Sequence, residues 1–165
     1  MARETVASLA LRLARLEACE SAQRTLSRYM DLCDVPRDTF NWDEMAALFT
    51  PDAIWEGLGP EYTGKFGRAE GQDAVLSMLA EYLPPAPHFR RNVHLLGNQQ
   101  ITTANGAVTG QWIMQQISEY KSGRTELISA RLTVDFVYAH GTTQISHFRT
   151  QKLFAADLAA NIVNA

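Results

Sequence analysis

The second half of the sequence contains four long runs rich in β-branched and aromatic residues, separated by residue pairs that favour tight turns. The pairs are Asn105-Gly106, Ser122-Gly123 and His140-Gly141. An Asn-Gly or similar pair between two alternating runs is the strongest short-range signal for a β-hairpin. The sequence therefore predicts a meander of four long antiparallel strands, at 93–103, 107–120, 125–138 and 142–154.

The first half of the sequence has the spacing of helices. Apolar residues recur at steps of three or four across 4–33, which predicts a long amphipathic helix that must end before Pro36. Shorter helices are expected at 42–49 and 71–83, a strand at 53–58, and a short helix in the tail at 155–165. Helices followed by an antiparallel meander define an α+β domain. We therefore expect a single domain over residues 1–165, an α+β cone or barrel with three N-terminal helices packed on a strongly curved, mostly antiparallel sheet.

Composition excludes several classes of function. The 165 residues include 15 Lys and Arg against 18 Asp and Glu, a net charge of −3, without the basic stripe of a nucleic-acid-binding protein. No apolar run approaches the roughly 18 residues that cross a membrane, and charged residues interrupt the N-terminal segment where a secretory signal needs a continuous apolar core. Cys19 and Cys33, about 21 Å apart along one predicted helix, are expected to be free thiols. We therefore expect a cytoplasmic protein without nucleic-acid or membrane partners.

Sequence motifs for cofactors and metals are missing. The chain contains no G-x-G-x-x-G opening a helix, no Walker loop, no H-E-x-x-H and no G-x-S-x-G. The histidines also lack metal-ligand spacing beside cysteines or carboxylates. What remains is cofactor-independent acid–base chemistry, or ligand binding, in a pocket between the helices and the curved sheet.

Three polar residues in apolar surroundings are the first candidates for such chemistry. Asp34 follows the first predicted helix, where the helix dipole disfavours a carboxylate unless a donor compensates it. His94 opens the first long strand, and His147 alternates with apolar residues in the last strand, where it could line the pocket. On spacing alone each residue also fits a structural role, as a turn residue or a buried imidazole. His88 and His140 are expected in a loop and in a solvated turn.

Five segments within about residues 15–154 form a recognisable pattern. They are L-x-x-Y-M-D-L-C-D, W-D-E-M-A-A-L-F-T-P-D-A-I-W-E-G, Y-T-G, H-L-L-G-N-Q-Q-I and G-Q-W. The pattern resembles the nuclear transport factor 2-like superfamily, and within it the SnoaL-like branch with scytalone dehydratase and hexachlorocyclohexane dehydrochlorinase. This superfamily hosts many unrelated activities, so the resemblance implies a fold more strongly than a reaction.

The resemblance also implies a catalytic pair. Lyases of this branch use an aspartate at the end of the first helix, which matches Asp34. They also use a histidine that opens a strand four residues before an Asn or Gly, which matches His94 followed by Asn98. The carboxylate would hold one ring nitrogen, and the other nitrogen would take a proton from an activated carbon while a hydroxyl or halide leaves. An imidazole with an ordinary pKa near 6.5 suits a base at neutral pH.

The substrate-binding residues expected around this pair are polar side chains that can donate hydrogen bonds and aromatic side chains that shape an apolar pocket. They are Tyr29, Ser129, Arg131 and His147, with Phe49, Trp55, Trp112, Phe136 and Phe148. Trp112 stands where scytalone dehydratase has a second histidine, and Arg131 where it has an asparagine. Scytalone itself is therefore not the expected substrate.

These observations predict a cofactor-independent lyase, most simply a dehydratase, that acts on a small cyclic or aromatic-type hydrophobic substrate without a metal. Two other functions stay open, an isomerase or polyketide-cyclase type of enzyme and a non-catalytic ligand-binding module of the same fold. Direct contact between Asp34 and His94 would favour an enzyme over the binding module. The resemblance, with outward-facing apolar residues on the strands at 107–120 and 125–138, predicts a homodimer or homotrimer.

Overall fold

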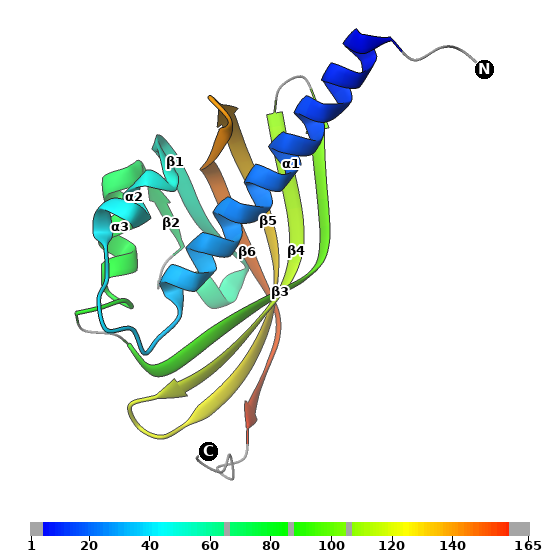
Figure 1. Cartoon of the computed structure of the whole chain (residues 1–165). Coiled ribbons are helices and arrows are strands. Elements are labelled where there is room, and N and C mark those ends of the chain that lie inside the picture. The colour runs from blue at the N-terminus through cyan, green and yellow to red at the C-terminus, as the bar shows by residue number, and fades with distance from the viewer. Residues whose placement is uncertain (1–4, 65–66, 86–87, 105–106, 159–165) are drawn as a thin grey trace.

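A computed structural model describes residues 5–64, 67–85, 88–104 and 107–158 (Figure 1). The first half contains α1 (Val6–Cys33), α2 (Trp42–Ala47), β1 (Phe49–Leu58), the short 3₁₀ helix η1 (Pro60–Tyr62), β2 (Arg68–Glu70) and α3 (Gln72–Ala80). The second half contains β3 (Phe89–Ala104), β4 (Ala107–Tyr120), β5 (Thr125–Ala139) and β6 (Thr142–Leu158).

The six strands form one mixed sheet in the order β2-β1-β6-β5-β4-β3. Neighbouring strands are antiparallel except for β1 and β6, which are parallel. The register shifts between Gly97 and Gln100 in β3, and between Ser129 and Ala130 in β5, and irregularities of this kind bend a strand. The sheet curls around the helices (Figure 1), which confirms the predicted α+β cone. It is a curled sheet rather than the closed barrel that the prediction allowed.

Several element boundaries differ from those expected from the sequence. The strand expected at 53–58 begins four residues earlier, at Phe49, which was expected to end the second helix. Residues 155–158 extend β6 instead of starting a helix, because they pair with β5 as far as Thr125↔Leu158. Residues 159–165, and the predicted turn pair Asn105-Gly106, lie outside the described residues.

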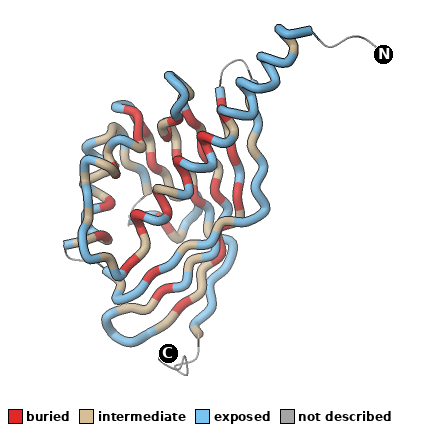
Figure 2. The backbone as a smooth tube through the Cα atoms, viewed as in Figure 1, coloured by how far each residue is buried: buried red, intermediate tan, exposed pale blue. Residues whose placement is uncertain are grey.

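The core lies between α1 and the concave face of the sheet (Figure 2). Leu26 of α1, Phe49 of β1, Trp112 of β4 and Ile145 of β6 are all fully buried there. The helix α3 packs against β1 and β2 and covers that side of the sheet. Cys19 and Cys33 are free, as expected. In the part of the chain that the structure describes, the helices are too short or too polar to span a membrane.

Candidate active site

The end of α1 is fixed to β3 by an isolated backbone bridge. The N–H of Val35 donates to the carbonyl of Asn92 at 3.0 Å, and the N–H of Asn92 donates to the carbonyl of Val35 at 2.9 Å. At Asp34 the chain leaves the helix in an extended conformation, with φ −79° and ψ 140°. Because Asp34 precedes the bridge on one side and His94 follows it on the other, the bridge brings these two residues together.

Asp34 and His94, the two residues that the resemblance implies as a pair, are in direct contact. Asp34 Oδ1 accepts a hydrogen bond from the backbone N–H of His94 at 3.0 Å and contacts the ring Nδ1 at 2.7 Å. These donors compensate a carboxylate that would otherwise face the negative end of the α1 dipole. A carboxylate at Nδ1 selects the tautomer with its proton there, so Nε2 carries a free lone pair. Within the described part of the chain, nothing is hydrogen-bonded to Nε2.

His94 lines a cavity of about 560 Å³ between α1, α3 and the inner face of the sheet. Its side chain is only 9% exposed, and that of Asp34 is 30% exposed. Aromatic rings form much of the wall. Trp55 stacks on Phe148 with centroids 5.4 Å apart and planes inclined by 15°, and Tyr29 packs against Phe148 at 5.2 Å. A cavity of this size with flat apolar walls suits a small cyclic molecule.

The Tyr29 hydroxyl is engaged by its neighbours in the cavity wall. Trp55 Nε1–H donates to it at 3.1 Å, and the Cys33 thiol lies close by. Burial raises the pKa of Tyr29 well above its ordinary value and the pKa of Cys33 to about 12. Both groups are therefore neutral at neutral pH, and they give the wall shape and weak polarity rather than charge.

The end of the β4–β5 hairpin adds a second polar group to the cavity lining. Tyr120 donates to Glu126 Oε2 at 2.6 Å, and Arg124 donates to Glu126 Oε1 at 2.7 Å. Burial, reinforced by the Glu126 carboxylate, raises the pKa of Tyr120 to about 12. The ring of His88 packs edge-on against Tyr120 with centroids 5.5 Å apart. The sequence interpretation placed His88 correctly in a loop, just before β3 begins at Phe89. It missed the polar group itself, since only the curl of the sheet brings the hairpin to the cavity.

Of the nine residues predicted to bind substrate or shape the pocket, Tyr29, Trp55 and Phe148 line the cavity with His94. The other six are absent from its lining. Phe49, Trp112, Phe136 and Ser129 are buried elsewhere, Arg131 is exposed, and His147 is partly buried on another face.

His147 has a structural partner instead. Its Nε2 lies 3.0 Å from Glu56 Oε2, and Arg68 contacts the same oxygen at 3.0 Å. The bond from His147, helped by Arg68, holds the pKa of the Glu56 carboxyl below its ordinary value. Successive residues of a strand point to opposite faces, so Phe148 reaches the cavity and His147 does not.

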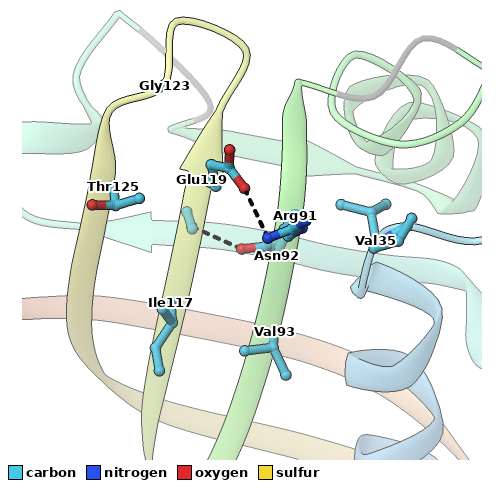
Figure 3. A pocket seen from close by; sticks show the side chains of 10 residues that line it. Val35, Arg91, Asn92, Val93, Ile117, Glu119, Gly123 and Thr125 are labelled. Carbon is cyan, nitrogen blue, oxygen red and sulfur yellow. Dashed lines mark hydrogen bonds and ion pairs between the residues drawn. The ribbon is translucent and has the colours of Figure 1, made fainter. Parts of the chain in front are cut away.

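A second hollow, of about 480 Å³, lies on the outer face of β3 and β4 beside Val35 (Figure 3). Val93 and Ile117 contribute apolar side chains to it, and Arg91 and Glu119 form an ion pair at 3.6 Å. Its lining includes no histidine or cysteine. In the described residues, no group of three His, Cys, Asp or Glu is placed to hold a metal ion. The cavity that holds His94 is therefore the candidate active site.

Comparisons with known proteins identify the family. The family model of the SnoaL-like domain matches residues 14–149. Hexachlorocyclohexane dehydrochlorinase LinA-type3 from Novosphingobium barchaimii LL02 is similar in structure with a TM-score of 0.69, at 17% identity, over 88% of this chain and 92% of that chain. A protein of Novosphingobium aromaticivorans proposed to be a scytalone dehydratase has a TM-score of 0.65 at 18% identity, over 88% of this chain and 89% of that chain.

An NTF2-like protein with a cystatin-like fold, also from Novosphingobium aromaticivorans, has a TM-score of 0.66 at 18% identity, over 92% of each chain. No match was found among the curated proteins. At these identities the solved structures show a shared fold, whereas the family model covers most of the chain. The protein therefore belongs to the family of SnoaL-like domains.

Proposed function

We propose that this protein is a cofactor-independent lyase, most simply a dehydratase, in which His94 is the general base. The observation that carries the proposal is the 2.7 Å contact between Asp34 Oδ1 and His94 Nδ1 at the wall of an aromatic cavity. This arrangement orients an imidazole and leaves its second nitrogen available to a bound molecule. A module that only binds an apolar ligand has no need of a carboxylate-held base at that position.

In the proposed reaction, His94 Nε2 takes a proton from a carbon activated by a neighbouring carbonyl or similar group. The electrons of the C–H bond form the new double bond as the bond to the leaving group breaks. A hydroxyl leaves as water after it takes the proton back from the imidazolium, whereas a halide leaves as the anion and the proton goes to solvent. The Asp34 carboxylate stabilises the imidazolium between these steps.

The cavity wall supports a small cyclic or aromatic-type hydrophobic substrate. Trp55 and Phe148 offer stacked faces, and Tyr29 completes that side of the cavity. The names of two structural neighbours, a dehydrochlorinase and a proposed dehydratase, describe eliminations of hydrogen chloride and of water. Neither the base nor the wall calls for a cofactor in this scheme.

The test is a panel of cyclic β-hydroxy ketones and hexachlorocyclohexane, followed by the absorbance of the conjugated product and by chloride release. His94→Ala removes the proton acceptor, so turnover of an accepted compound should fall by roughly 10²–10⁴-fold. His140→Ala is the matched control, because His140 is exposed in the turn between β5 and β6. It should retain the activity of the unmodified protein.

Product analysis separates the proposed function from its alternatives. Elimination gives a product that has lost water or hydrogen chloride, whereas an isomerase or cyclase using the same base gives other products. Undiminished turnover in His94→Ala would rule out the proposed base. Tight binding across the panel, with neither turnover nor exchange of substrate C–H protons in heavy water, would indicate a binding module instead.

A further inference from the structure

Gln116 is a direct cross-strand neighbour of the proposed base. It lies opposite His94 in the β3–β4 ladder, and both residues line the cavity. Directly opposed residues of an antiparallel pair have Cα atoms about 4.5–5.5 Å apart. A molecule that contacts His94 Nε2 therefore also lies within reach of the Gln116 side chain.

The orientation of the Gln116 amide is fixed by a chain of hydrogen bonds that starts at the end of α1. Asn92 Nδ2 donates to the backbone carbonyl of Cys33 at 3.4 Å. Because a carbonyl only accepts, Asn92 must present its Oδ1 to the opposite side. There Oδ1 accepts from Ser118 Oγ at 2.8 Å and from Gln116 Nε2 at 3.0 Å. Figure 3 shows Asn92 between Val35 and β4, with its bond to that strand dashed.

The same network engages the amide nitrogen of Gln116. Nε2 donates to Asn92 Oδ1 at 3.0 Å and to Ser118 Oγ at 3.0 Å. Gln116 Oε1 has no hydrogen-bond partner in the described part of the chain, and it is not among the buried side-chain atoms that lack one. It is therefore an accessible oxygen that can only accept.

The two free groups at this point of the cavity are thus both acceptors, Gln116 Oε1 and His94 Nε2. An acceptor that a bound ligand shields from water loses the hydrogen bond that water gave it, so a ligand that supplies a donor is favoured. A hydroxyl is the smallest neutral donor that suits a cavity with apolar walls.

We propose that Gln116 Oε1 is a specificity-determining hydrogen-bond acceptor, and that ligands of this cavity carry a neutral alcohol or phenol hydroxyl beside the carbon presented to His94. The position of the reacting carbon rests on the proposed function, whereas the preference for a hydroxyl does not. The proposal favours hydroxylated substrates over halogenated hydrocarbons, which have no donor to offer.

The test compares p-cresol with p-xylene, which replaces the hydroxyl by a methyl group of similar size. Dissociation constants come from NMR titrations of the full chain. Since p-xylene is the more hydrophobic probe, the informative quantity is the ratio of the two constants and how it changes in a variant. Gln116→Met should shift that ratio against p-cresol by about three- to tenfold, the worth of one neutral hydrogen bond.

The matched control is Gln115→Met, the same substitution one residue earlier. Gln115 is exposed and faces away from the cavity, so the ratio should stay as in the unmodified protein. A ratio that is unchanged in Gln116→Met would overturn the proposal. If the ratio shifts in His94→Ala instead, the hydroxyl is bound by the base.

A measurement on the unmodified protein keeps the test independent of how the variants fold. In a crystal structure with p-cresol, the phenol oxygen should lie about 2.5–3.0 Å from Gln116 Oε1. An oxygen bound elsewhere in the cavity contradicts the inference. None of these measurements needs turnover, so a Gln116-dependent preference in a protein without elimination activity would support the inference while refuting the lyase.

Discussion

A single oxygen of Asp34 faces two groups of His94, and this limits which residues can replace Asp34. Oδ1 faces both the backbone N–H and the ring Nδ1 of His94. Both contacts require an acceptor when the ring proton is on Nδ1. The residue thus fixes the position of the first residues of β3 as well as the tautomer of the base.

We expect Asp34→Asn to lose activity while the protein stays folded. The asparagine amide has no charge to stabilise the imidazolium. If it turns its NH₂ group toward Nδ1, it favours the tautomer with the proton on Nε2 and gives up the bond from the backbone N–H of His94. The corresponding change in a serine protease costs about 10⁴-fold in kcat, and a loss of similar order is expected here. Steady-state kinetics on an accepted substrate, with a thermal unfolding curve of the same sample, measure both parts of the prediction.

Asp31→Asn is the control for this substitution. Asp31 lies on the last turn of α1, is exposed, and pairs with Arg28 and Arg37. Exposed ion pairs contribute little stability, so this variant should keep its activity. An inactive Asp31→Asn beside an active Asp34→Asn would move the catalytic carboxylate to the preceding turn of the helix.

Within β4, Gly110 makes room for a buried ring. A Cβ built on Gly110 would lie 2.0 Å from the Cη2 atom of Trp112, whose side chain is 2% exposed. The indole thus packs over the glycine two residues before it on the same face of the strand. The G-Q-W segment of the sequence is explained by this packing, and Trp112 acts in the core rather than in the cavity.

Gly110→Ala should therefore destabilise the protein, because the new methyl group must displace a large side chain from a filled core. Overpacking of this kind typically costs about 1–3 kcal/mol of the free energy of unfolding, which denaturant titration measures. Gly97→Ala is the matched control in β3. Its nearest non-neighbouring atom would be 3.9 Å from the added Cβ, so a change within about 0.5 kcal/mol is expected. Equal losses in the two variants would contradict the packing argument.

At the scale of strands and helices, the sequence predicted the elements well and the faces of the strands less well. Turn pairs and periodicity predicted α1 and the four-stranded meander, and the family pattern predicted the pairing of Asp34 with His94. Ser129 and Arg131 were expected in the cavity, but Ile128 and Ala130 line it instead. Alternation along β5 places Ile128 and Ala130 on the cavity face and Ser129 and Arg131 on the opposite face, so an assignment that is one residue out exchanges the two faces.

The length of α1 shows a second limit of pattern reading. Leu9, Leu13 and Leu16 belong to the apolar stripe that predicts the helix, yet all three are exposed. The first turns of α1 extend past the edge of the sheet (Figures 1 and 2). Periodicity reports which residues share a helix face, but not where the surface that covers this face ends.

The helices cover the concave face of the curled sheet and leave its outer face uncovered (Figure 1). Val93 and Leu95 on β3, Ile117 on β4 and Phe154 on β6 are between 36% and 52% exposed. Val93 lies directly opposite Ile117 in the β3–β4 ladder. Exposed apolar side chains that lie side by side commonly mark interfaces.

We therefore expect a homodimer or homotrimer that packs through this face, which multi-angle light scattering at micromolar concentration measures directly. In Leu95→Asp/Ile117→Asp, each protomer would have to bury carboxylates against an apolar partner, so the mass should fall to that of the monomer while the far-ultraviolet circular dichroism stays unchanged. Leu11→Asp/Leu13→Asp, on the projecting turns of α1, is the matched control and should leave the assembly intact. If the control dissociates the oligomer and the sheet variant does not, the interface lies on α1. If the unmodified protein is a monomer at this concentration, the prediction of an oligomer is wrong and the outer face is exposed to solvent.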